Sequence, residues 1–143
     1  MISKLNKFIV CLFIYLIFFQ TLNAEQFNFD VTEIKIVDDG NKFIGTNRGK
    51  ITSEDGVEIE ADQFEYIKDT NILSAKGNIK IIDKINNYLI YTNHLIYKKN
   101  RNIIYTKGNS KALSSKDEIQ ITAKDFEYNR TKNIIKAKEN VFI

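Results

Sequence analysis

The chain has 143 residues, enough for one domain, and its 21 basic against 18 acidic side chains give a formal net charge of +3. So small an excess argues against nucleic acid or an anionic membrane surface as the main partner, because both require a concentrated positive field. The single cysteine, Cys11, lies in an apolar segment near the start, which excludes a disulfide framework and leaves the rest of the chain without a thiol nucleophile.

Residues 1–24 have the pattern of a secretory signal peptide. Lys4 and Lys7 give a basic start, an apolar run follows from Phe8 to Phe19, and Ala24 provides the small residue of a cleavage site. A membrane-spanning helix needs roughly 20 apolar residues, so this run is short for a permanent anchor, and an uncleaved anchor is the alternative. In either case the rest of the chain is expected outside the cytoplasm.

From Phe27 onward, short runs of alternating apolar and polar residues are separated by turn segments about every 15 residues. The turn segments are rich in Asn, Asp and Gly, which tolerate the left-handed backbone angles of tight hairpins. No helical period is present after the signal, so the sequence predicts an all-β chain. The predicted strands lie near 28–37, 42–52, 57–67, 72–82, 88–98, 103–113, 119–128 and 134–143.

The strands belong to tandem antiparallel repeats of about 31 residues. Segments 61–79, 92–110 and 123–141 each contain an aromatic or apolar pair, a polar turn and a second apolar pair at corresponding positions. Each repeat therefore holds two strands, and stacking the repeats would join their apolar faces into one interior.

The alternation changes phase within some predicted strands. Val57, Ile59 and Ala61 are apolar at odd positions. Phe64 and Tyr66, later in the same run, are apolar at even positions. Such a strand must contain a bulge or a bend. Two pleated layers joined by bent strands satisfy this pattern, which predicts V-shaped rungs with an apolar inside and bare strand edges at both ends of the stack.

The repeat resembles the OstA-like repeat of lipopolysaccharide-transport proteins, a family that includes LptA, LptC and the N-terminal periplasmic domain of LptD. The pattern A-D-x-F-E-Y, D-x-x-N, A-x-G-N-(V/I) is written here from Ala61 to Ile79, and the resemblance covers residues 27–143. The segment FDVTEIKI at 29–36 is similar to the opening of such a domain. Leu95 departs from the pattern where a phenylalanine is usual, and Glu139 stands where the other units have glycine.

The resemblance implies an open two-layer β-jelly roll over residues 25–143, in the periplasm of a Gram-negative cell, either free there or associated with the outer membrane. In the family, the groove holds the acyl chains of lipopolysaccharide, and edge strands join such domains end to end. An LptA-like protein and an N-terminal fragment of an LptD-like chain, which would continue into an outer-membrane barrel, both fit a sequence that stops in mid-strand at Ile143. The opening segment favours the LptD-like alternative, and an LptC-like protein would have to keep its apolar start in the inner membrane.

Two other interpretations of the residue pattern are a small outer-membrane β-barrel and a structural β-repeat scaffold without lipid binding. Uniformly short turns and the phase slips disfavour the barrel. Inward-phase side chains are the candidates for the lipid groove, and ordinary core packing is their alternative role. The candidates are Phe64, Tyr66, Leu73, Ile79, Leu95, Tyr97, Ile104, Phe126, Tyr128 and Ile135.

The sequence predicts no catalytic site, metal site or cofactor. His94 is on the outward phase and has no second histidine or cysteine beside it in the mature chain. Gly77 and Gly108 fall within predicted strands, where a bulge or a close backbone approach is expected. The remaining polar candidates recur with the repeat and are expected on the solvated face, namely Asp62, Glu65, Asp125 and Glu127.

Overall fold

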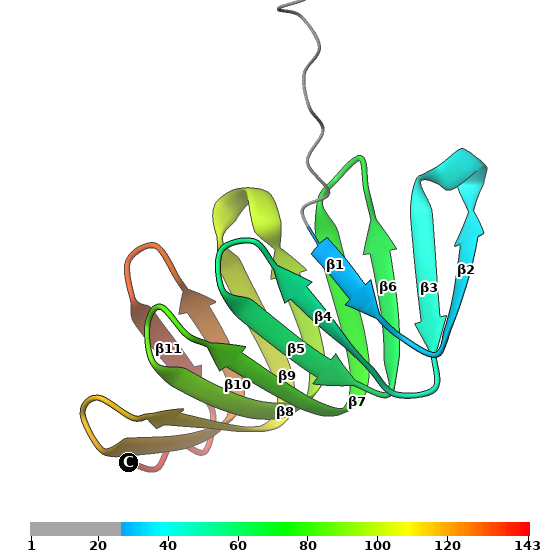
Figure 1. Cartoon of the computed structure of the whole chain (residues 1–143). Coiled ribbons are helices and arrows are strands. Elements are labelled where there is room, and N and C mark those ends of the chain that lie inside the picture. Colours follow the sequence, from blue (N-terminus) through cyan, green and yellow to red (C-terminus); the bar gives the residue numbers. More distant parts are fainter. Residues whose placement is uncertain (1–26) are drawn as a thin grey trace, which may run out of the picture.

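The computed structural model describes residues 27–143, and the predicted signal peptide at 1–24 lies outside this range. The described chain is all-β, with eleven strands and two single-turn 3-10 helices (Figure 1). Residues 27–143 contain no helix of the length and apolar character needed to cross a membrane. The elements are β1 (Phe27–Asp30), β2 (Glu33–Val37), η1 (Asp38–Gly40), β3 (Lys42–Thr46), β4 (Gly49–Ser53), β5 (Val57–Ala61), β6 (Gln63–Ile67), β7 (Ile72–Asp83), β8 (Tyr88–Lys98), η2 (Lys99–Arg101), β9 (Ile103–Ser114), β10 (Ile119–Asn129) and β11 (Ile134–Lys138).

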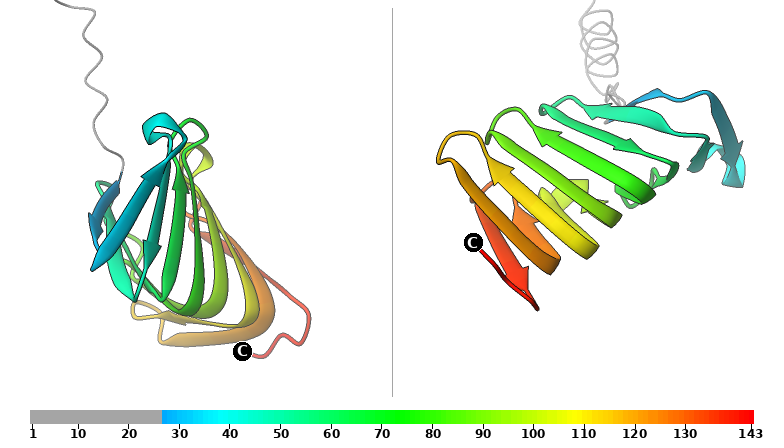
Figure 2. Two further views of the ribbon diagram at one scale, coloured as in Figure 1. Left: turned by 90° about the vertical axis from the view of Figure 1, so that its right-hand side faces the viewer. Right: turned by 90° about the horizontal axis from the view of Figure 1, so that it is seen from below.

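The strands form one antiparallel sheet that is folded into two layers (Figure 2). Layer one contains β1, β4, β5, the first parts of β8 and β10, and the last parts of β7 and β9. Layer two contains β2, β3, β6, β11 and the remaining parts of the four long strands. The strand order does not return from β11 to β1 or β2, so the sheet of the described residues is open. This is the predicted architecture of V-shaped rungs.

The bends coincide with breaks in strand register. The shift in β10 between Ala123 and Asp125 lies where a phase slip predicts it, and the shift in β7 between Lys76 and Ile79 lies at Gly77, where a bulge or a close backbone approach is expected. The predicted strand 57–67 is divided at Asp62 into β5 and β6. Strands 28–37 and 42–52 are divided in the same way, because in these rungs the chain leaves one layer completely before it enters the other.

Pairs of left-handed residues mark the corner in three successive repeats. The pairs are Gly77 (φ 79°) with Asn78 (46°), Gly108 (83°) with Asn109 (54°), and Glu139 (60°) with Asn140 (52°). The last pair ends β11 at Lys138, so the predicted strand 134–143 is too long. Beyond this corner Phe142 pairs with Thr122 in layer one. The corner geometry is therefore kept where glutamate replaces glycine.

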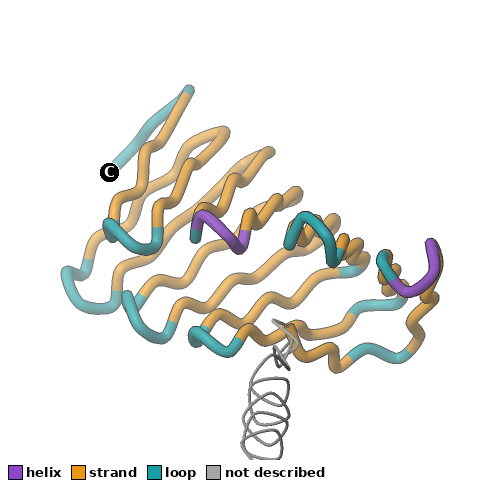
Figure 3. The backbone as a smooth tube through the Cα atoms, turned by 90° about the horizontal axis from the view of Figure 1, so that it is seen from above, coloured by secondary structure: helices purple, strands orange, loops and turns teal. Residues whose placement is uncertain are grey.

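The hairpin turns of layer two are joined to one another along the stack, where they form a row in Figure 3. Asn71 and Asn102, both at φ 52°, end successive turns 31 residues apart. The backbone N–H of Lys99 donates to the carbonyl of Asn71 (3.0 Å), and that of Arg130 donates to the carbonyl of Asn102 (2.9 Å). Each turn thus fixes the position of the next.

The two ends of the interior differ. At the end formed by β1 to β3, the rings of Phe29 in layer one and Phe43 in layer two stack at 5.8 Å. Tyr66 lies 5.8 Å from Phe29 and 6.0 Å from Phe43, so aromatic rings bridge the layers here. At the other end Ile119 is 45% exposed and Ile121 only partly buried, so the interior is less covered beside β10 and β11.

Candidate functional site: the space between the layers and its rim

All ten predicted groove residues lie between the layers, and all but Ile79 come from layer two. Nine of them are buried, the most exposed being Tyr66 at 6%, and Ile135 is partly buried against the same cluster. They pack against apolar side chains of layer one. The layer-one partners are Phe27, Ile51, Val57, Ile59, Ala61, Ile81, Ile90, Ala112 and Ala123.

This interior is mainly apolar from the aromatic cluster at β1–β3 to Ile121 and Ile135 at the opposite end, and its buried hydroxyls, Thr92, Thr106 and Ser110, hydrogen-bond to one another. Its side chains fill the space between the layers, so in this conformation the candidate groove residues form a packed core. The hydrogen-bonded strand ladders run within each layer and around the corners. Away from the corners, the layers are held to each other by side chains alone.

A polar cluster joins the two layers at the rim opposite the corners. Its centre is Arg130, which follows β10 in layer two and is only 7% exposed. Arg130 Nε donates to Asp83 Oδ2 in layer one (2.7 Å). Arg130 Nη1 donates to Asp55 Oδ2 (2.7 Å), and Nη2 donates to the Asp55 carbonyl oxygen (2.9 Å). Lys99 of layer two also pairs with Asp55.

Two buried tyrosines connect this cluster to the apolar interior. Arg130 Nη1 donates to Tyr97 Oη (2.8 Å), and the Tyr128 hydroxyl donates to Asp83 Oδ2 (2.8 Å). Asn86 Nδ2 in turn donates to Tyr128 Oη (2.8 Å). Among the described residues, every buried side-chain nitrogen and oxygen has a hydrogen-bond partner. We call Arg130, Lys99, Asp55 and Asp83 the latch.

The latch carboxylates are strongly biased toward the ionised form. Burial acts to raise the pKa of Asp55, but hydrogen bonds from Lys99, Ser53 and Arg130 outweigh it and hold that pKa well below the usual range. Burial likewise opposes ionisation of Asp83, yet the hydrogen bond from Arg130 and the backbone N–H of Asn86 lower its pKa. The latch is therefore charged at neutral pH.

The charges of the latch belong to two rims of opposite sign. The layer-one rim, made of turns 53–56, 83–87 and 114–118, carries five acidic and two basic residues. The part of the layer-two rim that faces it, made of turns 98–102 and 129–133, carries five basic residues and no acidic one. The other two layer-two turns, 38–41 and 68–71, contain Asp38, Asp39 and Asp69. Where the rims meet, opposite charges face each other across the mouth of the V.

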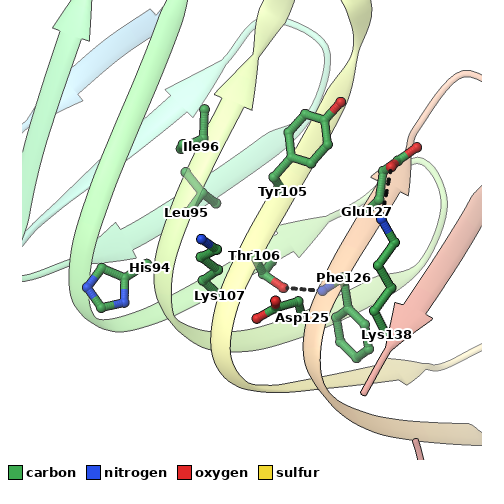
Figure 4. Close-up of a pocket in the computed structure, with 10 residues that line it drawn as sticks. All are labelled: His94, Leu95, Ile96, Tyr105, Thr106, Lys107, Asp125, Phe126, Glu127 and Lys138. Carbon is green, nitrogen blue, oxygen red and sulfur yellow. Dashed lines mark hydrogen bonds and ion pairs between the residues drawn. The ribbon is translucent and has the colours of Figure 1, made fainter. Parts of the chain in front are cut away.

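A second, shallow cleft of about 330 Å³ lies on the outer face of layer two (Figure 4). Ile96, Tyr105 and His94 border it, and Lys138 approaches it from β11. His94 is exposed on this outward face, as its phase predicts. Asp62, Glu65 and Glu127 pair with Arg48 (3.1 Å), Lys42 (3.1 Å) and Lys136 (3.4 Å), so three of the four repeated carboxylates are ion-paired surface groups.

The sequence did not identify the latch. Asp55, Asp83 and Arg130 lie in or beside turns whose composition indicates only a hairpin. In addition, 75 residues separate Asp55 from Arg130. The signal that could have identified them is the sign of the net charge of each turn. The turns of layer one are mainly acidic and the layer-two turns 98–102 and 129–133 are basic, and the repeat assigns alternate turns to alternate layers.

Comparison with known proteins gives a match in structure only. No family model and no curated protein sequence matches the chain. The crystal structure of LptH, the LptA-homologous periplasmic component of the lipopolysaccharide transport device of Pseudomonas aeruginosa, superposes with a TM-score of 0.72 at 11% identity and covers 79% of this chain and 82% of that chain. The chain thus has the LptA-like open β-jelly-roll fold, as the sequence pattern predicts.

Proposed function

We propose that the chain is a periplasmic lipid-binding module of lipopolysaccharide transport and outer-membrane assembly, which shelters acyl chains between its two layers. It acts by binding and handover, without catalysis. The observation that carries the proposal is the V-shaped stack whose interior is lined mainly by apolar side chains from one end to the other. The fold shared with LptH supports the same function.

Acyl chains can replace the contacts between the layers. Each methylene removed from water contributes about 0.8 kcal/mol, so a chain of ten or more carbons offsets the loss of several side-chain contacts. Parting the layers at the rim leaves the strand ladders intact, because these ladders run within the layers and around the corners. A lipid could therefore enter without unfolding of the sheet.

Docking with like domains would use the sheet edges. β1, β2 and β11 each pair with a single strand, which leaves one row of backbone donors and acceptors on each. Other lipopolysaccharide-transport jelly-roll domains are the expected partners, and an outer-membrane barrel is a further one if the chain is a fragment.

The test is photo-crosslinking to lipopolysaccharide from positions inside the stack. Phe126 is a poor position because it is only 2% exposed, and a change there would unfold the core. Ile121 and Ile135 are inward-facing and partly buried, so a benzophenone amino acid at either position should crosslink to lipopolysaccharide during export. Gln120 and Lys136, their outward neighbours, are the matched controls and should not crosslink.

The purified protein should also carry lipopolysaccharide that mass spectrometry detects. A structural scaffold of the same fold would yield neither the co-purified lipid nor the inward crosslinks. Equal crosslinking from inward and outward positions would show surface adsorption and would contradict the proposal.

A further inference from the structure

The two acids of the latch are provided with donors in their own layer. Asp83 accepts hydrogen bonds from the backbone N–H groups of Ile85 and Asn86 (both 3.1 Å) and from Asn86 Nδ2 (3.1 Å). Asp55 accepts one from the hydroxyl of Ser53, in the same turn. If the layers part, neither carboxylate is left without donors, so the acids tolerate opening of the latch.

The two cations of the latch have no such provision. Within layer two, Arg130 contacts only neutral acceptors, Tyr97 Oη at 2.8 Å and Asn102 Oδ1 at 3.4 Å. Lys99 pairs with Asp55 across the mouth, and the two layer-two turns that hold the latch cations, 98–102 and 129–133, contain no acidic residue. Parting the layers would leave two adjacent cations without an anion, which is unfavourable unless another anion replaces the carboxylates.

We propose that the latch gates the space between the layers and that a phosphate-bearing amphiphile opens it. The phosphate takes the place of Asp55 and Asp83 on Arg130 and Lys99, while the acyl chain enters the apolar interior. This inference rests on the proposed function, since it adds a head-group site to the lipid-binding space.

The chemistry of the latch fits a phosphate. A guanidinium fork binds carboxylates and phosphates through the same paired N–H donors, and a lysine ammonium adds a third contact. The rings of Tyr97 and Tyr128 lie directly beneath the latch and are fully buried, so a head group held there places its chain at the apolar interior. The latch acids are ionised at neutral pH because their pKa values are lowered, so titration does not open the mouth under those conditions.

Opening can be measured as a distance between the rims. In protein made from the full chain with Cys11→Ser, spin labels at Glu54→Cys and Arg101→Cys would mark two exposed rim positions, one in each layer. Dodecyl phosphate below its critical micelle concentration should lengthen the distance measured by double electron–electron resonance. Inorganic phosphate, which has no chain to fill the interior, should leave the distance unchanged.

Binding of the same probes, measured by titration calorimetry, tests the head-group site. Dodecyl phosphate should bind at least about tenfold more tightly than dodecyl maltoside, as expected for one or more charge-assisted hydrogen bonds. Lys99→Gln should weaken dodecyl phosphate about tenfold and leave dodecyl maltoside unchanged. Lys98→Gln is the matched control, because Lys98 lies over the Tyr105 ring on the outer face (5.2 Å) and should have no effect.

The outcomes separate this inference from the proposed function. Equal binding of both detergents, or no effect of Lys99→Gln, would overturn the latch as a head-group site while leaving a lipid-binding interior in place. Lengthening by inorganic phosphate alone would overturn the coupling between head group and chain. Absence of binding by either detergent, together with absent crosslinks from Ile121 and Ile135, would overturn the proposed function itself.

Discussion

Gly77 and Gly108 occupy the same corner position in successive repeats, with φ of 79° and 83°. The atoms that surround them differ. A Cβ on Gly77 would lie 2.6 Å from Asp62 Oδ2, whereas the nearest atom to a Cβ on Gly108 is 3.5 Å away. Asp62 is also held by Asn78 Nδ2 (2.7 Å), so it cannot move freely. Both positions therefore require a left-handed backbone, but only Gly77 lacks the space for a Cβ atom.

Alanine at the two glycines should therefore separate the two effects. Gly108→Ala should lower the free energy of unfolding by about 1 kcal/mol, the usual cost of a left-handed L residue. Gly77→Ala should cost about 1 kcal/mol more, measured by urea denaturation. In an Asp62→Ala background the cost of Gly77→Ala should fall to that of Gly108→Ala. Equal costs in the native background would contradict the steric argument.

The latch makes the free energy of unfolding depend on pH in the acid range. The folded-state pKa of Asp55 lies below its unfolded value, so its contribution is fully present above about pH 4 and is lost as the pH falls through the folded value. Asp55→Asn should be less stable than the native chain at pH 7, and the two urea midpoints should converge as the pH falls from about 4 toward 2. Glu54→Gln, at an exposed neighbour outside the latch, should follow the native chain throughout.

Sequence reasoning predicted single residues well where the repeat decides their environment. His94 and Asp125 were placed on the outer face and Gly77 at a bulge, because phase and left-handed preference are local properties. Arg130 and Asp83 were missed for a physical reason. The repeat determines which layer a turn belongs to, but the offset between turns of facing layers depends on the angle of the V and on twist, which periodicity does not contain.

The hairpin turns of layer two have similar backbone conformations, but their asparagine side chains make different contacts. Asn102 and Asn133 have φ of 52° and 53°. The side chain of Asn102 accepts from the Tyr97 hydroxyl (3.1 Å), and its backbone carbonyl accepts from Arg130 N–H (2.9 Å). Asn133 is exposed and lies outside the latch. The asparagine of the turn before β9 therefore supports the rim, whereas in the turn before β11 that support comes from Arg130, and Asn133 only shapes the backbone.

Alanine in these turns should show the difference. Asn133→Ala should cost on the order of 0.5–1 kcal/mol, from the left-handed backbone alone. Asn102→Ala should cost about 1 kcal/mol more, because it also leaves the buried Tyr97 hydroxyl with a weaker set of partners. Thermal denaturation measures both, and equal costs would show that Asn102 contributes nothing to the rim.

The strands themselves were predicted closely in position and less well in continuity. β8 coincides with the predicted strand 88–98, since its alternation is uninterrupted on both sides of the bend. The predicted strand 134–143 fails after Lys138, because Glu139 does not signal the left-handed corner that glycine signals at the equivalent positions. Asn140 alone, inside an otherwise alternating run, is too weak a signal to predict a corner.

Stability across the whole stack should be graded. β7, β8 and β9 are paired on both sides, whereas β2 and β11 are edge strands with largely exposed side chains. Amide hydrogen exchange under native conditions should be slowest in β7–β9, where exchange requires global unfolding, and faster in β2 and β11 through local opening. Uniform protection of all strands would show that the sheet opens as one unit.

The two ends of the stack differ in how far they are covered, which limits the path open to a bound molecule. The stacked rings of Phe29 and Phe43 cover one end, while Ile119 and Ile121 border a less covered end beside β11. If the chain binds lipid between its layers as proposed, a hydrocarbon chain that enters beside β11 would be stopped by these rings. Unless a neighbouring molecule displaces the rings, that lipid would have to leave through the end it entered or sideways past Arg130.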